Sequence, residues 1–270
     1  MKNRTAAEIR EHYEIEKRIA ERLRHSTPEE RKNLYTEAYD ELFQKVPFLV
    51  EDNYSPAEKQ KQVDKEVARL QPFLNENSTY LEIGPGDCAV AFAVAGQVKK
   101  VYAIDVSSEI TKTANAPANF KLMLSDGSSV PLAPASIDIA FSNQLMEHLH
   151  PDDSFRQLEN VFRALKTGGT YFCITPNRLS GPHDVSRDFD ATATGLHLKE
   201  YTVTELDALF RRVGFSKTRV CLGIGGIFLP ALPYKIAETL LDRLPPRVRK
   251  LLTFNKVVRF LLGVKLVGTK

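Results

Sequence analysis

The chain contains 270 residues, of which 43% are hydrophobic and 26% charged, which is the balance of an ordinary globular protein. A net charge of only +3 and the absence of Trp argue against a nucleic-acid-binding protein, which usually offers a basic groove and aromatic stacking residues. Cys88, Cys173 and Cys221 are widely spaced in apolar segments, and the charged N-terminus lacks an apolar signal region. We therefore expect core thiols and a cytoplasmic protein.

Residues 1–75 have the pattern of helices, because apolar residues recur there at helical spacing in three successive stretches. Thr27, followed by Pro28 and then Glu30, is a typical helix start with Thr27 as the N-cap. The sequence therefore predicts a helical N-terminal extension. This extension either packs on the core as a cap or covers an active site as a lid.

From about residue 76 the pattern changes to short apolar strands that alternate with helices. The predicted strands lie at 79–83, 101–104, 120–124, 137–141, 170–174, about 217–221 and 264–268. This alternation predicts one α/β domain over residues 76–270, with a doubly wound, mainly parallel seven-stranded sheet. A helical insertion is expected over about residues 223–260. Ligands of such sheets bind beyond the carboxyl ends of the strands.

A glycine-containing turn follows the first predicted strand. Gly84 and Gly86 permit a tight turn and a close backbone approach to a ligand. Together with Ala89 they also satisfy the dinucleotide-binding pattern, so an NAD-linked oxidoreductase is one interpretation. However, Glu82 and Asp87 flank the turn and would repel the pyrophosphate that a dinucleotide places there. Two carboxylates suit a cation, and S-adenosylmethionine carries a sulfonium and an ammonium group.

The motifs of one known family occur here in the same order. Segments that resemble successive motifs of class I S-adenosylmethionine-dependent methyltransferases are Glu82–Gly86, Val101–Asp105, Ser125–Gly127, Ile137–Leu149, Leu165–Gly169 and His197–Tyr201. The resemblance covers about residues 78–222 and leaves out the N-terminal extension and the insertion. Cys88 stands where the family often has a third glycine, a position in which a small side chain is tolerable.

This resemblance implies a cofactor site and a Rossmann-like fold. The residues that it assigns to S-adenosylmethionine, from the methionine end to the adenine, are Glu82, Gly84, Gly86, Asn143, Asp105, Asp126 and Gly127. Asp105 would accept hydrogen bonds from the ribose hydroxyls. Asp126 would contact the adenine amino group.

Methyl transfer to an oxygen requires removal of the hydroxyl proton, for which histidine is suited near neutral pH. His148 and His197 are the candidate bases, and Glu147 is placed to orient His148. The alternative for all three is a structural role or a solvated charge. A metal-dependent version of this site is the alternative, because some quinone-type O-methyltransferases that resemble this segment have Glu-x-x-Glu-His. We expect no metal in this chain. Here the first position is Gln144, a poor ligand for a hard metal.

A polar loop over Asn177–Gly195 follows the fifth predicted strand. His183, Asp184 and Arg187 are its candidate substrate contacts, and its hydroxyl, amide and charged groups suit a sugar or another polyol. The alternative is an ordinary surface loop.

The C-terminal residues form a basic block. Residues 227–270 contain nine basic and two acidic residues, a net charge of +7 that exceeds the total for the chain. Basic helices with an apolar face bind anionic membrane surfaces, so peripheral membrane contact is one interpretation. The other is an apolar face that packs on the core.

The sequence therefore predicts an S-adenosylmethionine-dependent methyltransferase. O-methyl transfer to a small-molecule, glycan or lipid-linked acceptor is preferred, because the candidate histidines suit a hydroxyl group. The alternatives are the NAD-linked oxidoreductase and a methyltransferase-like binding protein without turnover. The sequence identifies neither the acceptor nor the oligomeric state.

Overall fold

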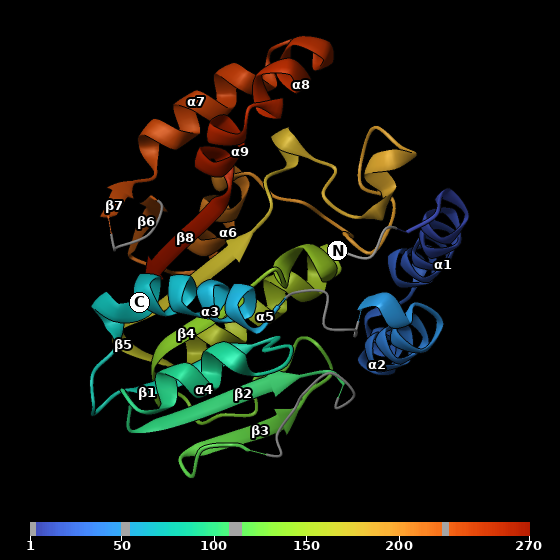
Figure 1. The fold of residues 1–270 in the computed structure, drawn as a ribbon. Coiled ribbons are helices and arrows are strands. Elements are labelled where there is room, and N and C mark those ends of the chain that lie inside the picture. Colours follow the sequence, from blue (N-terminus) through green and yellow to red (C-terminus); the bar gives the residue numbers. More distant parts are fainter. Residues whose placement is uncertain (1–3, 50–54, 108–114, 223–226) are drawn as a thin grey trace.

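The computed structural model describes residues 4–49, 55–107, 115–222 and 227–270. A central sheet carries helices on both faces (Figure 1). Its strands are β1 (Thr79–Ile83), β2 (Lys100–Asp105), β3 (Phe120–Leu124), β4 (Ile137–Asn143), β5 (Leu165–Thr175), β6 (Lys217–Leu222), β7 (Ile227–Pro230) and β8 (Val264–Thr269). The α-helices are α1 (Ala6–His25), α2 (Pro28–Lys45), α3 (Pro56–Leu70), α4 (Ala89–Ala95), α5 (Pro151–Ala164), α6 (Val203–Val213), α7 (Leu232–Asp242), α8 (Pro246–Phe254) and α9 (Lys256–Leu262).

The order of the strands is β3-β2-β1-β4-β5-β8-β6-β7, and the five strands from β3 to β5 are parallel. The final strand, β8, lies antiparallel between β5 and β6. The order reverses between β1 and β4, where Ile83 pairs with Ser142. The doubly wound parallel sheet is confirmed, and the reversal marks the edge at which such sheets bind ligands.

The prediction of seven strands was wrong by one. Ile227–Pro230, expected within the helical insertion, forms β7 and pairs antiparallel with β6 at the edge of the sheet. A four-residue apolar run carries too little periodicity to separate a strand from a helix. Pro230 is compatible with this position because an edge strand leaves one row of N–H groups without sheet partners. Residues 223–226 of the expected insertion lie outside the described residues, and the part after β7 forms α7, α8 and α9, as predicted.

The N-terminal helices become part of the main core. Ile19 and Leu23 of α1 and Tyr35 of α2 are buried in the cluster that also contains α5, α6 and one face of the sheet. The predicted N-cap is confirmed, since Thr27 and Glu30 form a capping box. Helix α3 lies on the opposite face with α4, where Leu70 is buried. The three helices therefore enclose the carboxyl edge of the sheet from two sides (Figure 1).

Candidate functional site

A cavity of about 180 Å³, here called the inner cavity, lies at the carboxyl ends of β1 and β2. Among the residues that line it are Gly84, Gly86, Asp105, Ser125, Gly127, Leu145 and His148 from the core, and Tyr35, Tyr39 and Phe43 from α2. The carboxyl ends of four parallel strands, β1 to β4, thus meet at one place, as expected for the switch point of a doubly wound sheet.

The turn after β1 depends on backbone conformations that favour glycine. Gly84 has a φ of +65° and Gly86 a φ of +55°, both in the left-handed region. A Cβ on Gly84 would lie 3.0 Å from the Leu145 side chain. Cys88 also has a positive φ, +64°, and is fully buried. This conformation explains why a glycine would fit at that position.

A second hollow, here called the α3 cavity, shares Gly84 and Gly86 with the inner cavity and continues toward α3. Glu82 and Asn143 line it, so the structure brings together the residues predicted for the methionine end. Burial raises the pKa of Glu82 to about 8, although the hydroxyl of Tyr80, 3.1 Å away, donates to its carboxylate and lowers the pKa. A ligand ammonium group in this cavity would favour the ionised form of Glu82.

The two acids predicted for the adenosine moiety differ in their surroundings. Asp105 lines the inner cavity and uses Oδ1 to accept hydrogen bonds from the backbone N–H groups of Val106 and Ser107. Its Oδ2 accepts no hydrogen bond from the residues that the structure describes, so it can accept from a ribose. Burial raises the pKa of Asp105. Asp126 instead turns into its own loop and accepts bonds from Ser129. At this place Ser125 and Gly127, rather than the Asp126 carboxylate, line the cavity.

Helix α2 covers the inner cavity with three aromatic side chains, Tyr35, Tyr39 and Phe43. Tyr35 approaches so closely that a Cβ on Gly127 would lie 2.9 Å from its ring. Its hydroxyl donates to Asp153 of α5 at 2.9 Å, and the same carboxylate forms a buried ion pair with Arg31. The cover is therefore attached to the core by buried polar contacts.

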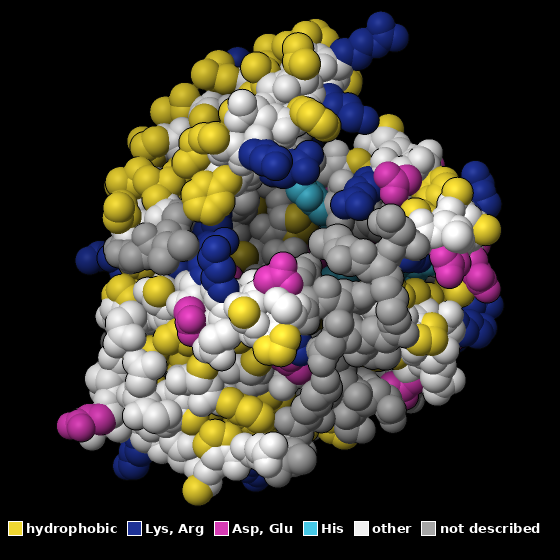
Figure 2. Space-filling model, in the orientation of Figure 1, with side chains coloured by type: hydrophobic (Ala, Val, Ile, Leu, Met, Phe, Trp, Pro, Cys, Tyr) yellow, Lys and Arg dark blue, Asp and Glu magenta, His cyan; other side chains and the backbone are white. Residues whose placement is uncertain are grey.

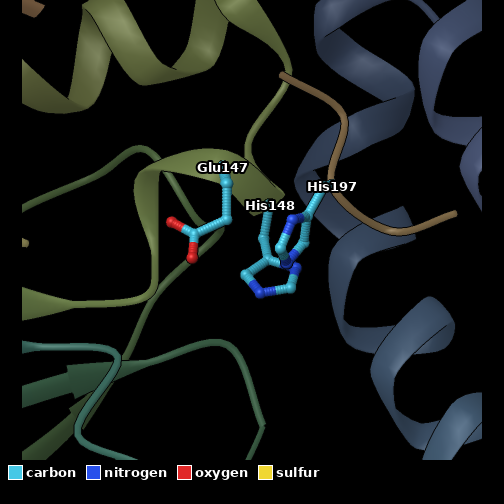
Figure 3. Close-up of side chains that lie close together, drawn as sticks. All are labelled: Glu147, His148 and His197. Atoms are coloured by element: carbon cyan, nitrogen blue, oxygen red, sulfur yellow. The ribbon is translucent and has the colours of Figure 1, made fainter. Parts of the chain in front are cut away.

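Glu147, His148 and His197 form a cluster in which one carboxylate oxygen and one nitrogen of each imidazole ring lie within 4.8 Å of one another. Figure 3 shows that the first two come from the turn after β4 and the third from the segment before α6. The two imidazole rings meet edge to face with centroids 4.9 Å apart. Because His148 lines the inner cavity and His197 lines a third hollow, the cluster lies between two cavities.

Each member of this cluster is oriented by a hydrogen bond. Nδ1 of His148 lies 3.2 Å from the carbonyl oxygen of Leu196, and Nδ1 of His197 lies 2.8 Å from Oε1 of Glu200. Thr175 donates to Oε2 of Glu147 at 2.7 Å. Oε1 of Glu147 is buried and has no hydrogen-bond partner among the described residues.

The charges of this cluster depend on one another. Burial raises the pKa of Glu147 to about 7. Burial and the neighbouring His197 lower the pKa of His148 to about 3, so His148 is neutral. Burial also opposes protonation of His197, but its hydrogen bond to Glu200 and the charge of Glu147 raise its pKa. The result is a histidine with a pKa raised above its ordinary value, His197, beside a neutral histidine, His148.

The third hollow, here called the loop cavity, has a volume of about 590 Å³, within the range of ligand pockets. The polar loop after β5 lines it with His183 and Arg187, two of the three residues that the sequence offers as candidate substrate contacts. Asp184 does not line this cavity. Its carboxylate accepts the N–H groups of Ser186 and His197, so it holds the loop in place. These bonds give Asp184 a structural role in the loop, and its contact with a substrate stays a prediction.

This arrangement of a doubly wound sheet, a glycine turn and an acidic residue at the end of β2 defines a Rossmann-like fold of the class I methyltransferase type. Residues 81–173 match the model of a family described as "Methyltransferase domain". A probable S-adenosylmethionine-dependent methyltransferase of Mycolicibacterium smegmatis is 28% identical over 139 residues, which cover 50% of this chain and 51% of that protein. The chain thus spans about half the length of the curated relatives that it matches.

Solved structures show the same fold. A phosphoethanolamine N-methyltransferase of Haemonchus contortus superposes with a TM-score of 0.58 at 16% identity, over 90% of this chain and 50% of that one. A SAM-dependent methyltransferase of Archaeoglobus fulgidus superposes with a TM-score of 0.55 at 17% identity, over 83% of this chain and 99% of that one. Together these matches show that the chain has the class I methyltransferase fold and that residues 81–173 resemble a methyltransferase domain. These matches favour S-adenosylmethionine over the NAD cofactor that the glycine pattern left open.

Several residues around the site escaped the sequence analysis. Tyr35 and Tyr39 were read only as an apolar stripe, because a helix that covers a cavity has the same periodicity as one that packs on a core. Glu200 orients His197, and its position three residues farther along the chain was the available signal. No pattern in the sequence indicated that Thr175, at the end of β5, would contact Glu147.

Proposed function

We propose that the protein transfers a methyl group from S-adenosylmethionine to a hydroxyl group of an acceptor held in the loop cavity. The observation that supports this is the position of His148 and His197, which touch each other while each lines a different cavity. Under this proposal the cofactor occupies the inner and α3 cavities, and the acceptor approaches from the loop cavity.

The roles of the side chains follow from their contacts. The bound cofactor would supply a methyl carbon attached to a positively charged sulfur. As the acceptor oxygen bonds to that carbon and the carbon–sulfur bond breaks, the hydroxyl proton passes to Nε2 of His197. Glu200, bonded to Nδ1, stabilises the resulting imidazolium and fixes the orientation of the ring. Glu147 adds a second negative charge nearby, and the neutral His148 occupies the space between the cavities.

The lining of the loop cavity suits a polar acceptor. Arg178, Ser180, His183, Arg187 and Lys199 offer donors for hydroxyl or phosphate oxygens, which favours a glycan or a lipid-linked acceptor over a flat apolar ring. Peripheral contact of a cytoplasmic protein with a membrane is part of this proposal. None of the helices in the described parts of the chain is both long and apolar enough to cross a bilayer.

We also propose that residues 1–75 act as a lid on the domain formed by residues 76–270. Tyr35 and Tyr39 of α2 close the inner cavity, and α3 borders the α3 cavity through Gln62 and Val63. Entry and exit of the cofactor would require these helices to move. Slower release of S-adenosylhomocysteine from the full chain than from a Tyr39→Ala variant would support a lid.

The proposal is tested with methyl-labelled S-adenosylmethionine and a panel of glycan and lipid acceptors, with S-adenosylhomocysteine measured as product. His197→Gln should reduce turnover at least 100-fold while leaving the affinity for S-adenosylhomocysteine within about twofold. His25→Gln, at the exposed end of α1, is the matched control. Unchanged turnover in His197→Gln would exclude this base. Loss of turnover on metal chelation would replace it with a metal-dependent mechanism at the same cluster.

A further inference from the structure

The segment of residues 231–262, which comprises α7, α8 and α9 and is here called the α7–α9 segment, turns its apolar side chains outward. Fourteen large hydrophobic side chains of the described residues are exposed, and twelve of them lie between Ile227 and Leu261. The residues that the helices bury are Glu238 on α7, Thr253 on α8 and Leu262 on α9. This is the reverse of a helix packed on a soluble core.

The exposed apolar residues form faces rather than scattered points. Leu232, Ile236 and Leu240 are four residues apart on α7 and 64%, 55% and 60% exposed. Leu251 and Phe254 on α8 are each 76% exposed. Figure 2 shows hydrophobic side chains gathered over α7, α8 and β7. Apolar patches of this kind on soluble proteins mark interaction sites.

The acidic residues of this segment are used internally. Glu238 is buried and accepts hydrogen bonds from Asn177 and from the backbone N–H of Val203 at the start of α6. Asp242 pairs with Arg178 and Arg249. Neither acid is therefore available to offset the positive charge that the segment presents to solvent.

The basic residues, in contrast, remain outside. Five exposed cations of the segment have no carboxylate partner among the described residues: Arg243, Arg247, Lys250, Lys256 and Arg259. They lie beside the apolar positions on α8 and α9 and in the turn between α7 and α8. An apolar face bordered by unpaired cations is complementary to an anionic lipid surface, which offers acyl chains below a layer of phosphates.

We propose that the outer face of the α7–α9 segment docks on an anionic phospholipid membrane. The apolar side chains enter the boundary between headgroups and acyl chains, and the five cations contact lipid phosphates. Because none of the helices in the described residues can span a bilayer, the segment lies on the membrane surface. The opposite side, with Glu238 buried against α6, stays attached to the protein.

Docking in this orientation places the loop cavity at the membrane. Lys250, Phe254 and Arg259 line that cavity from α8 and α9, while His197 lines it from the core. Figure 2 shows a hollow below this segment with Lys and Arg side chains at its rim. A lipid acceptor could place its polar headgroup in the cavity while its chains remain in the bilayer. This second step rests on the proposed methyl transfer, whereas the docking itself does not.

Vesicle flotation at low salt tests the docking. The full chain should float with vesicles of phosphatidylcholine and phosphatidylglycerol, and much less with phosphatidylcholine alone. Leu251→Glu with Phe254→Glu should reduce the bound fraction at least tenfold. Leu124→Glu, which changes a leucine 58% exposed on β3, is the matched control and should bind like the wild type. Arg243→Gln and Arg247→Gln should each weaken binding about fivefold.

Two results would overturn the docking proposal. One is a wild-type protein that stays with the soluble fraction in the presence of anionic vesicles. The other is equal flotation of the wild type and the double variant. The oligomeric state of the protein without vesicles is measured by sedimentation in the same experiment. If the wild type does not bind vesicles but forms a dimer, and the double variant is a monomer, the apolar face is the contact with a second copy of the chain. Calorimetry with S-adenosylhomocysteine distinguishes failure of the docking proposal from failure of the proposed function. The docking variants should still bind S-adenosylhomocysteine, because their substitutions lie outside the cofactor cavities.

Discussion

The buried carboxyl group of Glu82 links the cofactor site to the stability of the empty protein. It is 4% exposed, and burial raises its pKa to about 8 from an ordinary 4.5. A carboxyl whose folded-state pKa is raised contributes stability that is fully present below the unfolded pKa and is lost as the pH rises through the folded pKa. At 1.36 kcal/mol per pKa unit, the interval from 4.5 to about 8 corresponds to about 5 kcal/mol.

Glu82→Gln removes this titration while keeping the shape of the side chain. The stability of the variant relative to the wild type should therefore grow by about 4 kcal/mol between pH 5 and pH 9, measured by urea unfolding without cofactor. Glu76→Gln, in the exposed turn before β1, should follow the wild type at every pH. Parallel stability profiles of the wild type and Glu82→Gln would refute the burial argument.

The same substitution should have the opposite effect on cofactor binding. The ammonium group of S-adenosylhomocysteine favours ionised Glu82, so binding at pH 7 should release a proton and strengthen as the pH rises toward 8. Glu82→Gln should abolish the proton release and weaken binding roughly tenfold. Calorimetry in buffers of different ionisation enthalpy measures both quantities. Proton uptake on binding would contradict this assignment.

Three further outcomes follow from the site. Asp105→Asn should weaken S-adenosylhomocysteine binding roughly 10- to 100-fold in calorimetry, because a charged acceptor for the ribose is lost; unchanged affinity would remove Asp105 from the ribose site. Glu147→Gln should shift the acid limb of the pH–rate profile to lower pH, because the charge of Glu147 raises the pKa of His197; an unmoved limb would uncouple the two. Gly127→Ala, with a φ of +89° and a Cβ that would lie 2.9 Å from the Tyr35 ring, should cost about 1–3 kcal/mol in thermal unfolding. Wild-type stability in that variant would show that α2 is not held closely against the loop.

The sequence predicted the site best at positions where the residue type itself indicates a backbone conformation or a chemical role. Gly84 and Gly86 predicted a tight turn, which the structure has with left-handed glycines, and Asp105 after an apolar strand predicted an acid at the carboxyl edge. It was less informative about side-chain direction. The spacing of Ser125–Gly127 does not show that Asp126 turns into its own loop, because that outcome depends on nearby serine donors.

Long-range contacts could not be predicted from local patterns. His148 and His197 are far apart in the chain, and their contact depends on how the segment before α6 passes over the turn after β4. The apolar residues of α7 have the same helical spacing whether they face a core or solvent. Only the buried position of Glu238, which accepts hydrogen bonds at the start of α6, shows which side of the helix faces the protein.

The path of the chain around β6 has a consequence for how such proteins diversify. The α7–α9 segment leaves the sheet from β7, on one side of β6, and re-enters it as β8, on the other side. Its two ends are thus anchored on strands only two spacings apart, about 10 Å. A segment held in this way can be lengthened, shortened or exchanged at little entropic cost without altering the strand order. The match to the methyltransferase domain ends at residue 173, before this segment begins, so the matched domain and the α7–α9 segment can change independently.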